Sequence, residues 1–257
     1  MNQVRERGEP SGCQPTVLEE ANLIDFDGLG EAERTLFALA QAVEQRDSMT
    51  AGHCERLALT SMVLGRAMSL DRASLMVLYQ GGYLHDVGKV GIPDSILFKP
   101  GKLNAEEWVV MRSHPVRGEE ICRHLHSLEP VLPLIRHHHE RWDGSGYPDG
   151  LRGQQIPPLA RVLQVADIYD ALTSPRPYKP AYTHQKAIQI LEEETERGWR
   201  DPEIVSVFRS IQSELIVKVT QYTRQPDCDL GAMRASLLNH AHTFTPGESP
   251  LVRLRLS

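Results

Sequence analysis

The sequence predicts an all-α fold, and three observations support this prediction. Apolar residues recur at steps of three and four through most of the chain from residue 31 onwards. The strict alternation of β-branched and polar residues that marks strands is almost absent. Side chains typical of helix N-caps also stand before several of the periodic segments. With 257 residues, of which 40% are hydrophobic, the chain can bury a sizeable core as one large domain or a domain with appendages.

The periodic segments define the expected helices in order. The first begins at Glu31, where Leu36, Leu39 and Val43 follow the helical period. Further helices are expected at 57–68, 72–85, 105–114, 116–128, 131–140, 160–172, 183–196 and 202–216. Asp71 and Asn104 stand at expected N-caps, and Asp201-Pro202 supplies a cap together with a proline at the first helical position.

Other stretches depart from this pattern and suggest the domain boundaries. Residues 1–30 are polar and aperiodic, which predicts a linker or a loosely docked arm before a domain at 31–216. Residues 217–257 form a C-terminal extension of unknown role, with one expected short helix and a possible strand at its end. Within the domain, 87–103 and 142–158 are rich in glycine and proline, and loops of this length in a helical domain are usually functional.

Composition excludes several classes of protein. A formal net charge of −6 argues against a general coat for nucleic-acid polymers. No apolar run approaches the roughly 18 residues that a membrane span needs, and the first ten residues do not lead into a signal peptide. We therefore expect a soluble, cytoplasmic protein without a membrane partner. The four cysteines are scattered without a C-x-x-C pair, so neither a zinc knuckle nor a disulfide scaffold is expected.

Histidine is unusually frequent, with 11 copies in the chain. His85-Asp86 lies where an expected helix runs into a glycine-bearing loop, so both side chains can face one cavity. His53 lies 32 residues before His85, and His114 lies 29 residues after it. A pair such as His85-Asp86 is weak evidence alone, and isolated histidines are usually surface or core residues, as we expect for His124, His126, His184, His240 and His242.

Three consecutive histidines, His137, His138 and His139, close another expected helix, and Asp167 lies on a later one. Successive residues of a regular helix point about 100° apart, so at least one of these histidines should lie at a distorted helix end. Spacing alone does not decide which two of the three bind a metal. Neutral imidazoles and carboxylates bind zinc, iron, manganese or nickel, and one carboxylate can bridge two ions. Two such ions, roughly 3.5–4 Å apart, can lower the pKa of a shared water and direct the hydroxide at phosphorus.

Six strings surround these residues, in this order: H-D-V-G-K-V-G-I-P-D (85–94), F-K-P-G-K-L (98–103), H-H-E-R-W-D-G-S-G-Y-P (138–148), I-P (156–157), V-A-D-I-Y-D-A-L-T-S (165–174) and R-P-Y-K-P-A (176–181). Together they resemble the HD-GYP family, the subgroup of HD-superfamily metallophosphohydrolases that opens cyclic di-GMP. The resemblance extends over about residues 32–212. It implies a helical bundle with a metal cluster in an open groove, and a bacterial signalling hydrolase.

The resemblance also implies which residues bind metal. One ion would take His53, His85, Asp86 and Asp167. The second would take Asp86, His114, His138 and His139, with Asp86 as the bridge and His137 left out. Some family members hold a third ion through an acidic residue four positions before the first histidine. Met49 stands there in this chain and is a poor ligand for a hard metal, so we expect two divalent transition-metal ions, iron or manganese.

Further residues match substrate positions of the family. Lys89, four residues after His85, is expected to assist catalysis by neutralising a scissile phosphate oxygen. Arg176 and Lys179 match phosphate contacts, although a surface pair in a proline-rich turn is the plain alternative.

The remaining expectations concern the Gly-Tyr-Pro segment and two aspartates. Tyr147, in this segment, lines the groove or presents a surface to diguanylate cyclase (GGDEF) domains, unless the segment is a purely structural turn. Asp47 and Asp170 are candidates to orient the metal ligands through hydrogen bonds.

The activity implied by the resemblance is hydrolysis of cyclic di-GMP to pGpG, with GMP as a further product if the linear dinucleotide binds again. Two alternatives stay open. One is a hydrolase of another cyclic dinucleotide, such as the mixed guanine–adenine messenger, because the side chains that read the bases cannot be named. The other is a cyclic di-GMP sensor or interaction module with little turnover, although a complete ligand set argues against it. The regulatory input and the oligomeric state, a homodimer among the options, stay undetermined.

Overall fold

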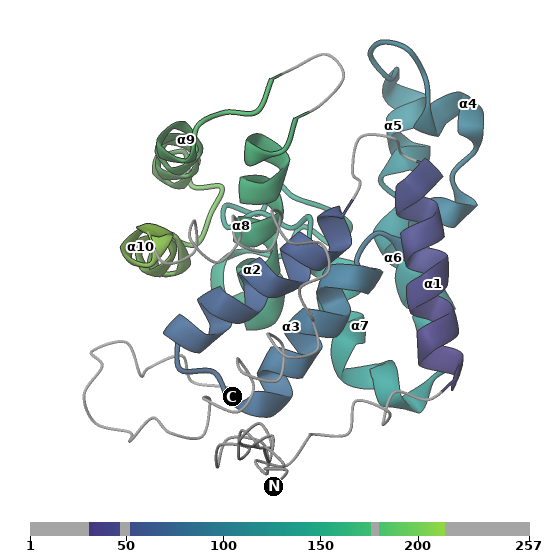
Figure 1. Cartoon of the computed structure of the whole chain (residues 1–257). Coiled ribbons are helices and arrows are strands. Elements are labelled where there is room, and N and C mark those ends of the chain that lie inside the picture. Colours follow the sequence, from purple (N-terminus) through teal and green to yellow (C-terminus); the bar gives the residue numbers. More distant parts are fainter. Residues whose placement is uncertain (1–30, 47–51, 176–179, 214–257) are drawn as a thin grey trace, which may run out of the picture.

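The computed structural model describes residues 31–46, 52–175 and 180–213. Every regular element in these ranges is a helix, so the expected all-α fold is confirmed (Figure 1). The helices are α1 (Glu31–Arg46), α2 (His53–Ala67), α3 (Arg72–Leu84), α4 (Asp94–Leu97), α5 (Ala105–Met111), α6 (His114–Cys122), α7 (Leu132–His137), α8 (Pro158–Thr173), α9 (His184–Glu196) and α10 (Pro202–Ser210). Three short 3₁₀ turns, η2 (Val87–Gly91), η3 (His126–Val131) and η4 (Gly153–Gln155), complete the series.

The three expected N-caps are confirmed. The Asp71 carboxylate accepts a hydrogen bond from the Ser74 amide at the start of α3. Asn104 forms a reciprocal capping box with Glu107 at the start of α5. Asp201 accepts from the amide of Glu203 at the start of α10. Each cap satisfies backbone donors that the first turn of a helix leaves unpaired, which fixes where these helices begin.

Several expected boundaries were wrong. The helix expected at 105–114 ends at Met111, and His114 begins a separate helix with Pro115 in its first turn. The physical reason is that Pro115 has no backbone N–H with which to continue the preceding helix, whereas in the first turn of a new helix that donor would be unpaired anyway. The helix expected at 116–128 likewise ends at Cys122, and the one expected at 131–140 ends at His137. The stretch 87–103 is also less irregular than expected, because it contains η2 and α4.

The core has two parts, both built on α3. The larger part joins α2, α3 and α8 to α9 and α10, with fully buried residues such as Leu57, Leu163 and Phe208. The smaller part joins α1 to α3, α6 and α7 around Leu84 and Cys122. Figure 1 shows α2, α3 and α8 at the centre, with α9 and α10 on one side and α1 and α6 on the other.

A glycine allows the two central helices to pack closely. A Cβ atom at Gly82 of α3 would lie 2.6 Å from the Cα of Ala58 in α2, so only glycine fits there. Gly82 lies within the last turn of α3, and His85 follows directly after the end of that helix. The close packing therefore places the start of α2 next to the end of α3.

The expectations for residues 1–30 and 217–257 lie outside the described residues.

Candidate metal centre

The seven residues implied as metal ligands lie in the described ranges, and the structure brings them together. Most stand at helix ends: His53 begins α2, His85 and Asp86 follow α3, and His114 begins α6. His138 and His139 come directly after α7, outside the regular helix, which confirms the expected distortion at this point. The remaining one, Asp167, lies within α8.

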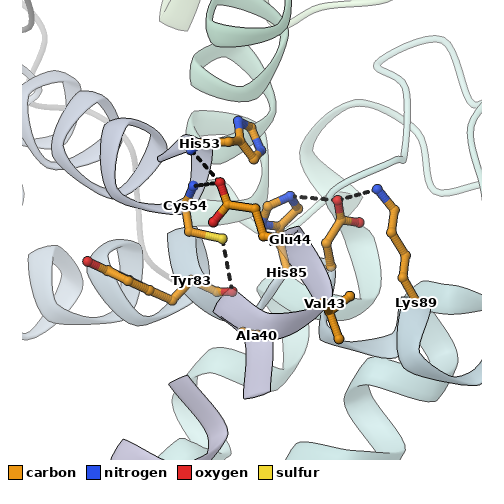
Figure 2. Close-up of a pocket in the computed structure, with 9 residues that line it drawn as sticks. Ala40, Val43, Glu44, His53, Cys54, Tyr83, His85 and Lys89 are labelled. Atoms are coloured by element: carbon orange, nitrogen blue, oxygen red, sulfur yellow. Dashed lines mark hydrogen bonds and ion pairs between the residues drawn. The ribbon is translucent and has the colours of Figure 1, made fainter. Parts of the chain in front are cut away.

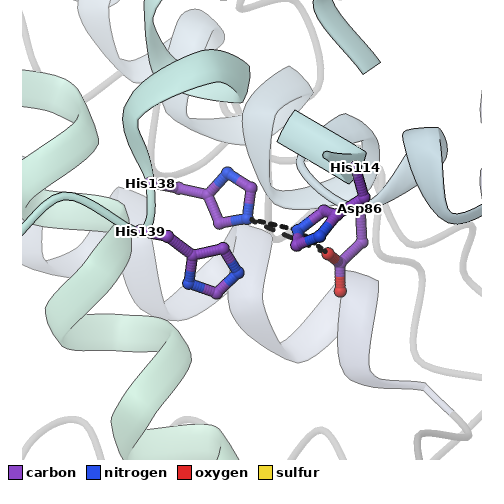
Figure 3. Close-up of side chains that lie close together, drawn as sticks. All are labelled: Asp86, His114, His138 and His139. Carbon is purple, nitrogen blue, oxygen red and sulfur yellow. Dashed lines mark hydrogen bonds and ion pairs between the residues drawn. The ribbon is translucent and has the colours of Figure 1, made fainter. Parts of the chain in front are cut away.

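The candidate ligands form two neighbouring groups. Asp86, His114, His138 and His139 form one, and His53, His85 and Asp167 form the other; within each group the potential ligand atoms lie within 4.8 Å of one another. Figure 3 shows the imidazoles of the first group gathered around the Asp86 carboxylate. In the second group, Nε2 of His53 lies 3.5 Å from Oδ1 of Asp167.

Asp86 contacts both groups through different oxygens. Its Oδ1 lies 3.1 Å from Nε2 of His114 and 3.8 Å from Nε2 of His138. Its Oδ2 lies 3.2 Å from Nε2 of His85 and 2.6 Å from the Lys89 ammonium. A carboxylate with one oxygen toward each group has the geometry of a bridging ligand.

Main-chain carbonyls fix the orientation of three imidazoles. Nδ1 of His85 donates to the carbonyl of Gly82, Nδ1 of His114 to that of Met111, and Nδ1 of His138 to that of Ile135, at 3.2, 2.9 and 2.7 Å. A proton on Nδ1 leaves the Nε2 lone pair free, and these lone pairs face Asp86. The backbone therefore sets the tautomer that metal binding requires.

Two atoms at the centre are buried without a hydrogen-bond partner: Nε2 of His85 and Oδ1 of Asp86. In addition, Nε2 of His114 lies 3.3 Å from Nε2 of His138. Because the Nδ1 atoms of both rings serve as donors, two lone pairs approach each other there. Unpaired buried acceptors are costly unless a cation lies between them. The residues therefore fit a site for divalent metal ions.

The protonation states of the histidines also suit metal binding. Burial, reinforced by the neighbouring imidazoles, holds the pKa of His138 and of His139 well below the usual value. Both rings are therefore neutral at pH 7, as a metal ligand must be. For Asp86, desolvation acts to raise the pKa, but Lys89 and the adjacent histidines outweigh it and hold the pKa well below its usual range.

His53 is oriented differently, by a side chain of α8. Nδ1 of His53 lies 2.7 Å from Oδ2 of Asp170. Arg56 binds the same carboxylate through Nε and Nη2, at 2.7 and 3.0 Å. Burial acts to lower the pKa of His53, yet the hydrogen bond to Asp170 and the charge of Asp167 raise it above the usual value. Asp170 thus has the orienting geometry expected from the sequence.

The turn after Asp86 depends on a second close approach of a glycine. A Cβ at Gly88 would lie 1.9 Å from the carbonyl oxygen of His114 and 2.5 Å from the amide nitrogen of Gly118. Only glycine therefore lets η2 pack against α6. This packing sets the distance between Asp86 and His114 and explains the glycine of the H-D-V-G-K string in physical terms.

The pocket in Figure 2 lies beside the second group and extends toward α1. The cavity has a volume of about 20 Å³, which is room for one water molecule. Glu44 of α1 lines it, and its carboxylate accepts from the backbone amides of His53 and Cys54 at 2.5 and 3.4 Å. Because Gly52 has no side chain with which to cap α2, Glu44 supplies this cap from another helix.

Sequence reasoning missed Glu140 and Gln164, which hold the main chain on either side of the Gly-Tyr-Pro segment. The buried Glu140 carboxylate accepts from the amides of Asp149, Gly150 and Leu151. The Gln164 amide donates to the carbonyls of His138 and Glu140, which ties the end of α7 to α8. Glu140 directly follows the His-His pair, and this adjacency was the one available signal.

The remaining predicted residues fall into two groups. Lys89 and Tyr147 lie at the centre: Lys89 contacts Asp86, and the Tyr147 ring stacks on His139 with ring centroids 4.8 Å apart. The predictions for Asp47, Met49, Arg176 and Lys179 lie outside the described residues.

His137 does not join the centre and instead lies near Glu140 and Asp149. Asp149 is paired there with the Arg136 guanidinium at 2.7 and 2.9 Å. A positive charge at this position disfavours a cation, so this third group does not extend the metal centre.

Comparison with known proteins agrees with this centre. Residues 38–204 match the model of the HD domain, so the chain belongs to the HD-domain family. The more specific resemblance to its HD-GYP subgroup is confirmed by the relatives. No helix in the described part of the chain is both long enough and apolar enough to cross a membrane.

Two relatives and one solved structure illustrate the likeness. The cyclic di-GMP phosphodiesterase response regulator of Xanthomonas campestris is 40% identical, over 74% of this chain and 51% of the relative. The 3′3′-cGAMP-specific phosphodiesterase 3 of Vibrio cholerae is 35% identical, over 74% of this chain and 40% of the relative. This chain therefore spans about half the length of such relatives or less. The crystal structure of a V. cholerae cyclic GMP-AMP-specific phosphodiesterase shares the fold, with a TM-score of 0.55 at 20% identity over 80% of this chain and 53% of that one.

Proposed function

We propose that this chain is a metal-dependent phosphodiesterase that hydrolyses cyclic dinucleotides, with cyclic di-GMP as its substrate. One observation carries the proposal: the Asp86 carboxylate lies between two histidine groups and directs a separate oxygen toward each. His53, His85, Asp86 and Asp167 would hold one divalent ion. Asp86, His114, His138 and His139 would hold the other. Bound divalent cations would ionise water near neutral pH and neutralise charge on the phosphoryl oxygens.

The chain's own residues would prepare this site. The three main-chain carbonyls and Asp170 keep the imidazole lone pairs directed inward without rearrangement when substrate binds. Lys89 places its ammonium beside the centre, where it would stabilise charge on the scissile phosphate in the transition state. Tyr147 covers His139 and would form one wall for the substrate. Hydrolysis adds hydroxide to phosphorus, breaks the bond to the 3′ oxygen and protonates that oxygen, which yields linear pGpG.

A second substrate has specific support. Relatives of V. cholerae that are 35% and 37% identical to this chain are named as specific for 3′3′-cGAMP, while the X. campestris relative, at 40% identity, is named for cyclic di-GMP. The mixed dinucleotide contains the same phosphodiester linkage and one guanine. We therefore propose 3′3′-cGAMP as the alternative substrate of the same centre.

The test is product chromatography after protein loaded anaerobically with iron(II) or manganese(II) is incubated with each dinucleotide. We expect pGpG, or GMP after a second cut, from cyclic di-GMP. The double variant His85→Ala/Asp86→Ala should form no product, whereas His124→Ala, an exposed histidine outside the centre, should match the wild type. If the protein forms product from 3′3′-cGAMP but not from cyclic di-GMP, 3′3′-cGAMP is the substrate. No product from either dinucleotide by metal-loaded protein would reject the phosphodiesterase proposal.

A further inference from the structure

An exposed arginine beside the centre has no role in the function proposed above. Arg112 follows α5 and lies two residues before His114. Its guanidinium carbon lies 5.5 Å from the ring centroid of Trp108 and 5.3 Å from that of Tyr147. Tyr147 in turn stacks on His139 of the metal centre. The guanidinium is therefore separated from a candidate metal ligand by a single aromatic ring.

The surroundings of Arg112 leave its hydrogen-bond donors available. The residue is exposed, and among the described residues it has ring contacts but neither an ion pair nor a hydrogen-bond acceptor. Trp108, its neighbour one turn earlier in α5, is 44% exposed although tryptophan is usually well buried. Rings that contact a guanidinium restrict its movement, while the N–H groups in its plane stay free to bind a ligand. The group is thus held in place without a partner in this part of the chain.

We propose that Arg112 reads the edge of a guanine base of the substrate; this inference rests on the proposed function and deepens it. Guanine presents two acceptors, O6 and N7, that match the paired donors of a guanidinium. Adenine presents N7 beside an amino group, and this amino donor repels the N–H donors of a guanidinium. A base next to Arg112 would also lie close enough to the centre for its own phosphate to reach the metal ligands. Both substrates proposed above contain guanine, so one guanine subsite serves either, and the second base distinguishes them.

Trp108 provides a readout of base binding that does not depend on catalysis. A base that docks on Arg112 changes the surroundings of the adjacent indole and hence its fluorescence. The other two tryptophans, Trp142 and Trp199, contact different arginines, Arg161 and Arg141. The variant Trp108→Phe should remove the ligand-dependent signal and so assign it to Trp108.

The experiment titrates metal-loaded protein with 5′-GMP, 5′-AMP and ribose 5-phosphate and follows tryptophan emission. We expect the wild type to prefer GMP over AMP. Arg112→Gln should lower the GMP-to-AMP affinity ratio between about tenfold and a hundredfold, because glutamine pairs with adenine rather than guanine. Arg123→Gln, an equal charge change at an exposed arginine after α6, should keep the wild-type ratio. The ratio of kcat/KM for cyclic di-GMP and cyclic di-AMP should fall in parallel in Arg112→Gln.

The outcomes separate this inference from the proposed function. An unchanged GMP-to-AMP ratio in Arg112→Gln would overturn the guanine subsite, as would the absence of any mononucleotide binding to the wild type. An equal loss of affinity for all three probes would mean that Arg112 binds phosphate, which also overturns it. If the wild type hydrolyses no cyclic dinucleotide, the proposed function fails, while the binding ratio still decides the role of Arg112.

Discussion

Oδ2 of Asp170 lies 2.7 Å from Nδ1 of His53, and Asp170 stands one helical turn after Asp167 on α8. The same helix therefore supplies a candidate ligand and the group that orients the ligand opposite it. His53 is at the first position of α2, where backbone geometry alone constrains a side chain weakly. The carboxylate also raises the basicity of Nε2, which strengthens the histidine as a ligand.

Substitution of Asp170 should therefore weaken metal binding without removing a ligand. We expect Asp170→Asn to lower metal affinity or turnover by about tenfold to a hundredfold, the usual effect of losing such a partner. The measurement is competition with a chelator of known affinity. Ser174→Ala is the matched control, since Ser174 contacts the same carboxylate at 3.3 Å but not His53. Equal affinities of wild type and Asp170→Asn would contradict the orienting role.

The two ligand groups predict distinct metal stoichiometries. Asp167 belongs to one group and His139 to the other, so Asp167→Ala and His139→Ala should each lower the bound metal from about two ions per chain to about one. Asp86→Ala removes the carboxylate shared by both groups and should leave close to none. Elemental analysis after gel filtration measures these values. A full complement of metal in Asp86→Ala would show that Asp86 does not bridge.

A buried ion pair outside the metal centre should contribute to stability. Nη1 of Arg161 lies 2.5 Å from Oδ2 of Asp201, and both residues are at most 5% exposed. Asp201→Asn keeps an oxygen able to cap α10 but leaves the guanidinium buried without a counter-charge. We expect a loss of roughly 3–5 kcal/mol in the free energy of unfolding, measured by urea denaturation.

Asp71→Asn provides the comparison for this change. Asp71 also caps a helix, but it is exposed and has no buried partner charge. Its substitution should cost less than about 0.5 kcal/mol because asparagine is an equally good cap. Similar losses in the two variants would show that capping, rather than the ion pair, accounts for the effect of Asp201.

Stability should fall at high pH through a buried thiol. Burial raises the pKa of Cys122 to about 12, whereas a thiol in the unfolded chain titrates near 8.5. The folded state therefore retains a proton that the unfolded state releases, so the stabilisation is complete below the unfolded pKa and is lost as pH rises above it. Between pH 8 and pH 10 this should cost about 2 kcal/mol.

The measurement compares the free energy of unfolding of wild type and Cys122→Ala at these two pH values. The alanine variant should be less stable at pH 8, because a cavity replaces a fully buried side chain. Its stability should nevertheless fall less steeply with pH. Parallel pH dependences of the two proteins would show that Cys122 stays protonated in both states or in neither.

Helical periodicity and caps were sufficient to predict the fold class, and Asp71, Asn104 and Asp201 mark real helix starts. A break at Pro115 was expected, but the helix ends were misplaced: the preceding helix already ends at Met111, and the next one begins at His114 rather than at Val116. Periodicity reports which face of a segment is buried, whereas a helix end depends on individual backbone hydrogen bonds.

The site could be predicted in part for a related reason. The histidines and aspartates of the centre are recognisable as possible metal ligands from their residue type alone, and the strings around them resemble those of a known family. Glu140, Gln164 and Arg112 act through contacts outside their own helical turns, namely with the amide of Asp149, the carbonyl of His138 and the ring of Tyr147. Their partners are set by tertiary packing, so sequence spacing carries no record of them.

The carbonyls that orient three of the imidazoles belong to Gly82, Met111 and Ile135, and each of these hydrogen bonds uses a main-chain oxygen rather than a side chain. The orientation of these candidate ligands thus depends on the path of the main chain, which at position 82 requires glycine for the close packing on α2. Sequences can diverge around such a centre while its coordination geometry persists, provided that the helix ends stay in place. For the same reason, the centre could be transferred into a designed helical bundle by reproducing a few helix termini.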